Sequence, residues 1–261
     1  MNAPQISRET VVEAVWPAYT LRQPSIALVV GGSGEIGGAI ASTLSASGCE
    51  TWVLDVEEPP PTLDARFVSV DVGDEGSVHD ALEHTLGRGP FENGAAVIYA
   101  AGVSGPMPVT ELSLEVWEWV MRVNTTGGFL VAKHALPWLV RRPWSRLVFI
   151  SSMSSFVANR GRHNAHYCAS KAALNGMTHQ LAATYADQGL TVNAVLPGYV
   201  RTTMVTDNWP ASDVAALDAM IPTGRLARPE EMVAPVMLLT SEQSSYVNGV
   251  LLVVDGAYTR W

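Results

Sequence analysis

The sequence predicts an α/β fold: a single doubly wound parallel sheet of seven strands, flanked by helices. Three observations support this prediction. Seven short apolar runs alternate with helix-type segments, and parallel neighbours in a sheet require such crossovers. A glycine-rich turn follows the first run. Finally, 261 residues of which 48% are hydrophobic suit one large domain, and we see no internal repeat and no second domain.

The domain is expected to span residues 25–261, after an N-terminal extension of residues 1–24. The extension contains Pro4, Pro17 and Pro24. A mobile or surface-packed segment is its simpler interpretation, and a partner-binding arm is the alternative. The organised chain starts at Ile26.

Each expected strand is a short β-prone run that stops at a glycine, an aspartate or a serine. They lie at 25–30, 50–55, 66–71, 94–102, 145–152, 190–198 and 249–256.

Helices are expected between these strands. The first occupies 37–48 and stops at Gly48, and the second occupies 74–86 with Asp74 as its N-cap. Further helices are expected at 113–139, as one long helix or two joined near 127–128, and at 166–187. Pro229 is suited to the first position of a helix, and residues 199–227 are expected to form a loop.

A glycine turn joins the first strand to the first helix, in the sequence Gly31-Gly32-Ser33-Gly34-Glu35-Ile36-Gly37. Glycines there let the backbone approach a pyrophosphate, which the helix N-terminus then binds through its N–H groups. We therefore expect a Rossmann-type sheet with Gly31, Ser33, Gly34, Ile36 and Gly37 as cofactor contacts. A mere tight turn between packed elements is the alternative.

An acidic residue follows at the distance that dinucleotide binding requires. Asp55 ends the second strand, where a carboxylate accepts hydrogen bonds from the adenosine ribose and repels a 2′-phosphate. No Lys or Arg occupies 56–58, and Glu57 and Glu58 add negative charge, so we expect NAD(H) rather than NADP(H). Asp71, with Val72 beside it, is expected at the adenine. An ordinary turn role explains Asp55 less well than a ribose contact does. For Asp71, a turn role is almost as good an explanation as an adenine contact.

Tyr167 and Lys171 lie four residues apart in YCASK, which places them on one face of a helix. A phenol is a weak acid at neutral pH, and we expect a neighbouring ammonium to lower its pKa. Ser152 ends the fifth strand, at the sheet edge where ligands bind, and its hydroxyl can reach a substrate oxygen. Each feature alone has a plain structural explanation, but together they predict an acid–base site.

With these motifs the chain resembles the short-chain dehydrogenase/reductase family from about residue 26 to 255. The resemblance implies Tyr167 and Lys171 as the YxxxK pair, Ser152 as the family serine, and Asn124 as the asparagine of a water-linked proton relay. It also implies cofactor contacts in two further stretches, YAAG and PGYVRT. These contacts are Ala100, Ala101, Gly102, Pro197, Gly198, Val200 and Thr202. Tyr167 and Lys171 are expected to contact the cofactor as well, with Lys171 at the nicotinamide ribose hydroxyls.

Three features depart from the family pattern. Val30 and Glu35 replace the threonine and the middle glycine of the usual glycine motif. The spacing of Gly31, Gly34 and Gly37 resembles the form found in the extended subgroup of the family, so we expect the phosphate loop to survive with its middle glycine moved by one position. The alternative is a Glu35 side chain that points at the pyrophosphate, where its charge would weaken cofactor binding. Tyr99 replaces the first asparagine of NNAG. Ser152 and Tyr167 are separated by fourteen residues, which leaves Ser154 as a possible substitute for Ser152.

The resemblance implies an NAD(H)-dependent oxidoreductase that interconverts a secondary alcohol and a ketone on a small to medium, possibly cyclic, substrate. Ser152 and Tyr167 bind the carbonyl oxygen, and Tyr167 donates the proton. Substrate contacts are expected from Ser154, Tyr199, Met204 and Trp209, although the last three also fit ordinary loop packing. The alternatives are a nonredox isomerase, dehydratase or cyclase on the same scaffold, and a cofactor-sensing binding protein.

Composition restricts the partners. A net charge of -9 disfavours nucleic acid and anionic membranes, and no apolar stretch reaches the about 18 residues of a spanning helix. Two cysteines favour a reducing compartment, so we expect a cytoplasmic enzyme. The six histidines are scattered, so no metal is expected. The family resemblance implies a homo-oligomer, a dimer or a tetramer built through the two long helices at 113–139 and 166–187 and through the C-terminal strand.

Overall fold

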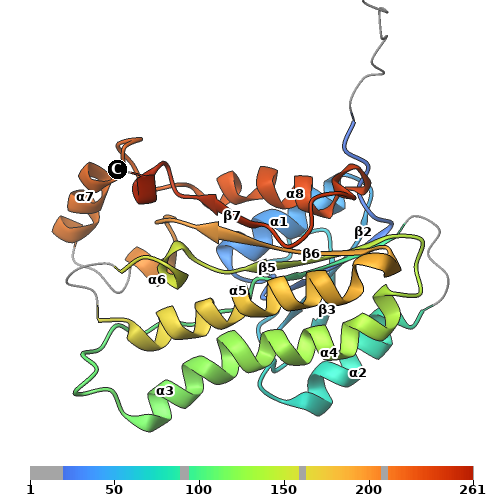
Figure 1. Cartoon of the computed structure of the whole chain (residues 1–261), viewed down its shortest axis with the longest axis horizontal. Helices are drawn as coiled ribbons and strands as arrows, with labels where there is room; N and C mark the ends of the chain where they lie inside the picture. Colours follow the sequence, from blue (N-terminus) through green and yellow to red (C-terminus); the bar gives the residue numbers. More distant parts are fainter. Residues whose placement is uncertain (1–19, 89–93, 159–162, 207–210, 261) are drawn as a thin grey trace, which may run out of the picture.

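The computed structural model describes residues 20–88, 94–158, 163–206 and 211–260. Its seven strands form one parallel sheet in the order β3-β2-β1-β4-β5-β6-β7, which confirms the predicted fold (Figure 1). The strands are β1 (Ile26–Val30), β2 (Glu50–Asp55), β3 (Arg66–Ser69), β4 (Ala95–Tyr99), β5 (Ser145–Ile150), β6 (Leu190–Pro197) and β7 (Leu251–Val254).

Helices cover both faces of the sheet. The α1 and α8 helices lie on one face, and α2, α4 and α5 lie on the other (Figure 1). The eight α-helices of the described residues are α1 (Glu35–Ala46), α2 (Glu75–Leu86), α3 (Leu114–Met121), α4 (Gly127–Leu139), α5 (Ala165–Tyr185), α6 (Thr203–Thr206), α7 (Ala211–Met220) and α8 (Val233–Thr240).

The strand residues divide between two apolar cores. Along β1, Ile26, Leu28 and Val30 pack into one core and Ala27 and Val29 into the other. Successive strand side chains point to opposite faces, so a central strand covered on both sides is apolar throughout. That is why the first predicted strand has no polar alternation.

The helix starts follow the capping chemistry of the sequence. The Asp74 carboxylate accepts a hydrogen bond from the Ser77 N–H at 2.7 Å, which confirms the predicted N-cap of α2. Ser113 caps α3 in the same way, at 3.3 Å from the Val116 N–H. Pro229 begins a 3-10 turn that leads into α8.

The segment 113–139 contains two helices joined through a π-helical turn. The turn covers Arg122–Thr126 and lies between α3 and α4, so the junction falls at the predicted glycines. The loop predicted at 199–227 is wrong in part, because it contains α6 and α7. The α7 sequence is rich in alanine, whose helix propensity is high, but it lacks an apolar period that would reveal it.

The order of the strands fixes where a ligand can lie. The chain proceeds outward from β1 in one direction through β2 and β3, and then returns to β4 on the other side. Loops after β1 and β4 therefore diverge at the carboxyl edge of the sheet, and ligands of open α/β sheets bind at such a crevice. Among the described residues, no helix is long and apolar enough to cross a membrane.

Candidate active site

The glycine turn packs directly against the loop that follows β4. Gly31 has a φ of +80°, and a Cβ there would lie 2.3 Å from the Ala101 nitrogen. A Cβ on Gly37 would lie 2.1 Å from the Gly31 carbonyl oxygen. A side chain at either position would therefore clash with the backbone. Gly37 does not line the cavity described below, so its role is close packing of the turn rather than contact with a ligand.

The start of α1 suits a phosphate group. Gly34 is the N-cap residue and has no side chain to occupy the first N–H groups of the 12-residue helix. A helix start of this kind attracts anions through its N–H groups and its dipole. The cradle formed by the turn is thus compatible with a dinucleotide pyrophosphate.

Asp55 holds the glycine turn in place. One carboxylate oxygen accepts a hydrogen bond from the Ser33 N–H at 3.0 Å, and the other accepts one from the Val56 N–H at 2.8 Å. The Ser33 hydroxyl donates to the Glu57 carbonyl at 2.6 Å. Asp55 is consequently a turn residue as well as a candidate ribose ligand.

A cavity that we call the cofactor cavity runs along this edge of the sheet. It brings together most of the residues predicted to bind the cofactor: Gly31, Ser33, Gly34, Asp55, Asp71, Val72, Ala100, Ala101 and Gly102. Sequence reasoning missed Trp119, Arg122 and Thr203, which also line it. Arg122 precedes the Val-Asn of the family motif, but nothing in the sequence shows that it faces this cavity. The Asp71 carboxylate also accepts a hydrogen bond from the Gly73 N–H at 2.8 Å, so Asp71 stabilises the turn after β3 as well as lining the cavity.

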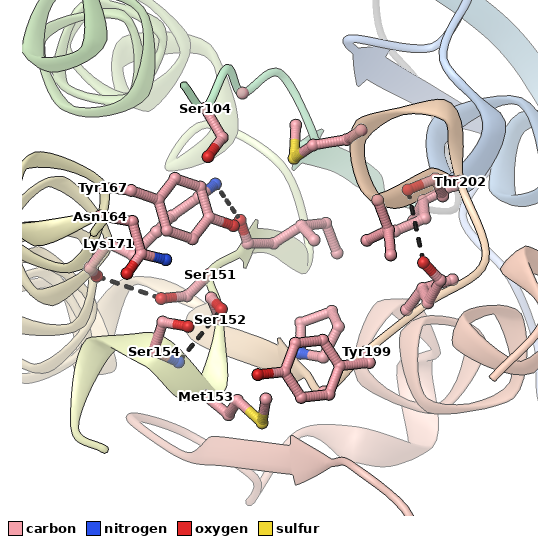
Figure 2. Close-up of a pocket in the computed structure, with 18 of the residues that line it drawn as sticks. Ser104, Ser151, Ser152, Met153, Ser154, Asn164, Tyr167, Lys171, Tyr199 and Thr202 are labelled. Carbon is pink, nitrogen blue, oxygen red and sulfur yellow. Dashed lines mark hydrogen bonds between the residues drawn. The ribbon is translucent and has the colours of Figure 1, made fainter. Parts of the chain in front are cut away.

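A second cavity, here called the substrate cavity, contains the residues predicted for acid–base chemistry (Figure 2). Its walls include these predicted residues: Ile36, Ala100, Gly102, Ser152, Ser154, Tyr167, Lys171, Pro197, Gly198, Tyr199, Val200, Thr202 and Met204. Ala100 and Gly102 line both cavities, so the two adjoin at the end of β4. Ile36 and the residues from Pro197 to Thr202 lie on the substrate side of that junction. The predicted contact Trp209 lies outside the described residues.

Ser152 and Tyr167 are paired inside the substrate cavity. The Ser152 side chain hydrogen bonds to the phenol, and its oxygen accepts the Ser154 N–H at 3.1 Å. This pairing favours Ser152 over Ser154 as the family serine. Burial raises the pKa of Tyr167, and the Ser152 hydrogen bond offsets only part of that effect. The expectation that Lys171 makes the phenol more acidic is therefore wrong, because desolvation of the phenolate outweighs the Ser152 hydrogen bond, and Lys171 is not among the groups that shift this pKa.

Lys171 lies close to the phenol ring without bonding to its hydroxyl. The Lys171 Nζ is 5.7 Å from the Tyr167 ring centroid and donates a hydrogen bond to the Ile150 carbonyl at 2.9 Å. Burial lowers the pKa of Lys171 to about 8. A Cβ on Gly102 would approach Nζ to 3.1 Å, so this glycine leaves room for the amine.

Asn124 lies behind the two cavities and lines neither. Its side-chain oxygen accepts the Val103 N–H at 2.8 Å, and its amide donates to the Val103 carbonyl and the Ser170 hydroxyl, each at 2.9 Å. The amide therefore connects the loop after β4 to α5, the helix that carries Tyr167 and Lys171. The π-helical turn that presents Asn124 is a feature often associated with functional sites.

Tyr99 supports that turn from below. Its hydroxyl donates to the Val123 carbonyl, one residue before Asn124, and burial raises its pKa strongly. A Cβ on Gly127 would fall 2.4 Å from the Tyr99 oxygen. The tyrosine and the glycine therefore fit each other, and Tyr99 braces the helix where the family pattern has an asparagine.

Glu35 directs its carboxylate across the edge of the cofactor cavity. One oxygen accepts the Thr203 N–H at 2.8 Å and the other accepts the Thr203 hydroxyl at 3.1 Å. Both carboxylate oxygens thus have a partner from α6.

The sheet order and the glycine turn define a Rossmann-type α/β protein, and the predicted acid–base residues line a cavity at the carboxyl edge of its sheet. Comparison with known proteins gives the family. A family model described as enoyl-(acyl carrier protein) reductase matches residues 32–259. The chain is 34% identical to cis-4-hydroxycyclohexanecarboxylate dehydrogenase of Sinomonas cyclohexanicum, covering 90% of this chain and 96% of the relative.

Two further comparisons agree. The chain is 32% identical to D-threitol dehydrogenase of Mycolicibacterium smegmatis, over 90% of this chain and 92% of the relative. A solved structure from Beutenbergia cavernae, described as an NAD(P)-dependent gluconate 5-dehydrogenase with NADP bound at low occupancy, superimposes with a TM-score of 0.82 at 30% identity. That match covers 90% of this chain and 97% of the other. The chain belongs to the short-chain dehydrogenase/reductase family.

Proposed function

We propose that this protein is an NAD(H)-dependent oxidoreductase that interconverts a secondary alcohol and a ketone. The observation that carries the proposal is the arrangement of Ser152, Tyr167 and Lys171 in the substrate cavity, which adjoins the cofactor cavity at Gly102. The relatives reported above are named as dehydrogenases, which favours redox chemistry over a nonredox isomerase or dehydratase.

The proton in this proposal moves through the phenol. The Ser152 hydroxyl and the Tyr167 hydroxyl bind the carbonyl oxygen of a ketone, and Tyr167 donates its proton to that oxygen as the alcohol forms. Lys171 stabilises the phenolate that results, and Asn124 supports the loop and helix that hold these groups in register. Nicotinamide, when bound, supplies or accepts the hydride.

The residues proposed to hold the dinucleotide line the cofactor cavity. Gly31, Ser33 and Gly34 would receive the pyrophosphate, and Asp55 the adenosine ribose. Glu35, Glu57 and Asp71 add further negative charge around Asp55, while Arg122 is the single cation among the described lining residues. A cavity with this balance favours NAD(H) over a cofactor with an additional phosphate.

Asp55→Asn tests this preference. The substitution keeps an oxygen that can accept the Ser33 N–H but removes the charge. The ratio of NADPH to NADH affinity, measured by quenching of intrinsic fluorescence, is expected to rise about tenfold, as about 1.4 kcal/mol of lost repulsion requires. An unchanged ratio would remove Asp55 from the account of cofactor preference.

The substrate is proposed to be an uncharged, small to medium secondary alcohol with a ring or several hydroxyls. Ser104, Ser154, Asn164 and Tyr199 give the cavity neutral polar groups, and the remaining described wall contains apolar residues such as Met153 and Met204. Lys171 is the only charged side chain among its described lining residues. Relatives named for a cyclic substrate and a polyol support the same class.

The assembly is proposed to be a dimer or tetramer through α4 and α5. These helices expose an apolar groove that includes Phe129, Leu136, Met177, Leu181 and Tyr185. Phe129 is 48% exposed in the single chain, and such a patch is typical of an interface. A cytoplasmic location completes the proposal, supported by two free cysteines.

A panel assay tests the function. The protein is mixed with NAD and cyclohexanol, cyclohexane-1,2-diol or threitol, and absorbance is followed at the NADH band. Turnover of at least one alcohol is expected from the wild type, and Tyr167→Phe is expected to abolish it while NADH binding remains nearly unchanged. Turnover by Tyr167→Phe, or NADH binding without redox change for every alcohol and ketone tried, would refute the assignment.

A further inference from the structure

We propose that Glu35 is a positioning residue that ties the start of α1 to the start of α6, and so sets the wall between the cofactor and substrate cavities. This inference rests on the proposed function. It concerns a position where the family pattern has a glycine, and where a charge close to a pyrophosphate is unfavourable unless it has another role.

The contact joins two distant parts of the chain. Glu35 and Thr203 lie 168 positions apart in the sequence, and the Glu35 carboxylate accepts hydrogen bonds from both the N–H and the hydroxyl of Thr203. Hydrogen bonds to an ionised group are stronger than neutral ones, and two donors on two oxygens also fix an orientation. The carboxylate therefore specifies where residue 203 lies relative to the glycine turn.

The place of the contact gives it a role in both cavities. Glu35 and Thr203 both line the cofactor cavity. Their immediate neighbours, Ile36, Thr202 and Met204, line the substrate cavity. The bridge between Glu35 and Thr203 thus spans the boundary between the two cavities, above the place where α1 begins.

The other backbone hydrogen bonds around α6 explain why an external tie matters. The N–H groups of Val205 and Thr206 donate to the Thr202 carbonyl at 2.9 and 2.8 Å, which shapes the short helix internally. The Arg201 N–H donates to the Ala227 carbonyl at 2.8 Å, which connects the residues just before α6 to the segment that follows α7. The Glu35 contact adds a connection from this segment to the start of α1.

The geometry favours positioning over simple repulsion of the cofactor. Because both oxygens of Glu35 accept hydrogen bonds from Thr203, part of its charge is compensated within that contact. Loss of the carboxylate should therefore loosen Met204 and Thr202, and the cost should fall on substrate affinity rather than on the chemical step.

Hydrogen–deuterium exchange on the cofactor-free protein tests the contact itself. Glu35→Ala is expected to speed exchange of the Thr203 amide about tenfold, whereas Glu35→Gln, which keeps one acceptor oxygen, is expected to retain most of the protection. Glu83→Ala is the matched control, because it removes an exposed glutamate that is paired with His79 on α2. Equal exchange in Glu35→Ala and wild type would overturn the proposal, even if both proteins turn over substrate.

Steady-state kinetics and NADH titration test the consequence. Glu35→Ala is expected to raise the KM of the alcohol about fivefold with a smaller change in kcat, and Thr203→Val to give part of this effect. The alcohol KM of the double variant should not exceed that of Glu35→Ala, because both substitutions act on the same contact between Glu35 and Thr203.

The outcomes separate this proposal from the proposed function. Tighter NADH binding by Glu35→Ala with an unchanged alcohol KM would mean that the carboxylate only repels the cofactor, and would overturn the positioning role. Absence of NADH binding by the wild type would instead refute the proposed function, while the exchange experiment would still decide the contact.

Discussion

Replacement of Lys171 by methionine should separate the stability of this fold from its activity. Lys171 is buried, and burial lowers its pKa from an ordinary value of 10.5 to about 8. Each unit of pKa difference corresponds to about 1.4 kcal/mol, so the charged lysine costs the folded state about 3 kcal/mol at neutral pH. Methionine fills a similar volume without the charge.

The sign of the pH dependence follows from where the proton binds. Between pH 8 and 10.5 the unfolded chain holds the Lys171 proton more tightly than the folded chain, so wild-type stability rises with pH in that window. Below pH 8 both states are protonated and the full cost applies. The folded state should therefore recover about 2 kcal/mol of this cost of about 3 kcal/mol as the pH is raised from 7 to 9.5. The variant lacks this group and should lack this gain.

Urea unfolding of both proteins at pH 7.0 and 9.5 measures the effect. The Lys171→Met variant also loses the hydrogen bond to Ile150, but that loss is independent of pH and cancels when the two pH values are compared. The advantage of the variant over wild type should shrink by about 2 kcal/mol on raising the pH. A difference that stays constant across this range would refute the burial argument for Lys171. Hydride transfer by the variant should be lost at both pH values.

Three other substitutions test separate parts of the structure. Gly31→Ala should abolish NADH binding and lower Tm by several degrees, because its Cβ would fall 2.3 Å from the Ala101 nitrogen at a φ of +80°; thermal unfolding with and without NADH would contradict this if the ligand still stabilised the variant. Tyr99→Phe should cost about 1 kcal/mol in urea unfolding, because the Val123 carbonyl loses a donor; equal stability would show that the brace is not needed. Phe129→Glu should shift the mass found by light scattering toward the monomer, and an unchanged mass would exclude the α4 face as an interface.

The sheet could be predicted from the sequence because its signals are local. Glu50–Asp55 contains the apolar, β-prone run Trp52-Val53-Leu54 and ends at an aspartate, and the observed β2 has the same limits. The Asp74 cap was equally visible, since a cap depends on a side chain three residues from its donor. The acid–base residues were accessible for the same reason, because YCASK places two of them one helical turn apart.

Contacts between distant residues could not be predicted in this way. The sequence marks Glu35 as unusual but does not indicate Thr203 as its partner, because the contact depends on how α6 folds back over α1. Tyr99 and Gly127 fit each other across two elements, and only the packed structure relates them. The raised pKa of Tyr167 likewise depends on burial, which the spacing to Lys171 does not measure.

Isotope transfer tests the central claim most directly. The protein is incubated with NADH that carries deuterium at the transferable position of the nicotinamide and with cyclohexanone, followed by the other ketones of the panel, and the alcohol is analysed by NMR. The account predicts deuterium on the carbinol carbon of at least one product, and none when Tyr167 is replaced by phenylalanine. If no ketone acquires deuterium from the wild type, or if the phenylalanine variant transfers it equally well, the account is contradicted.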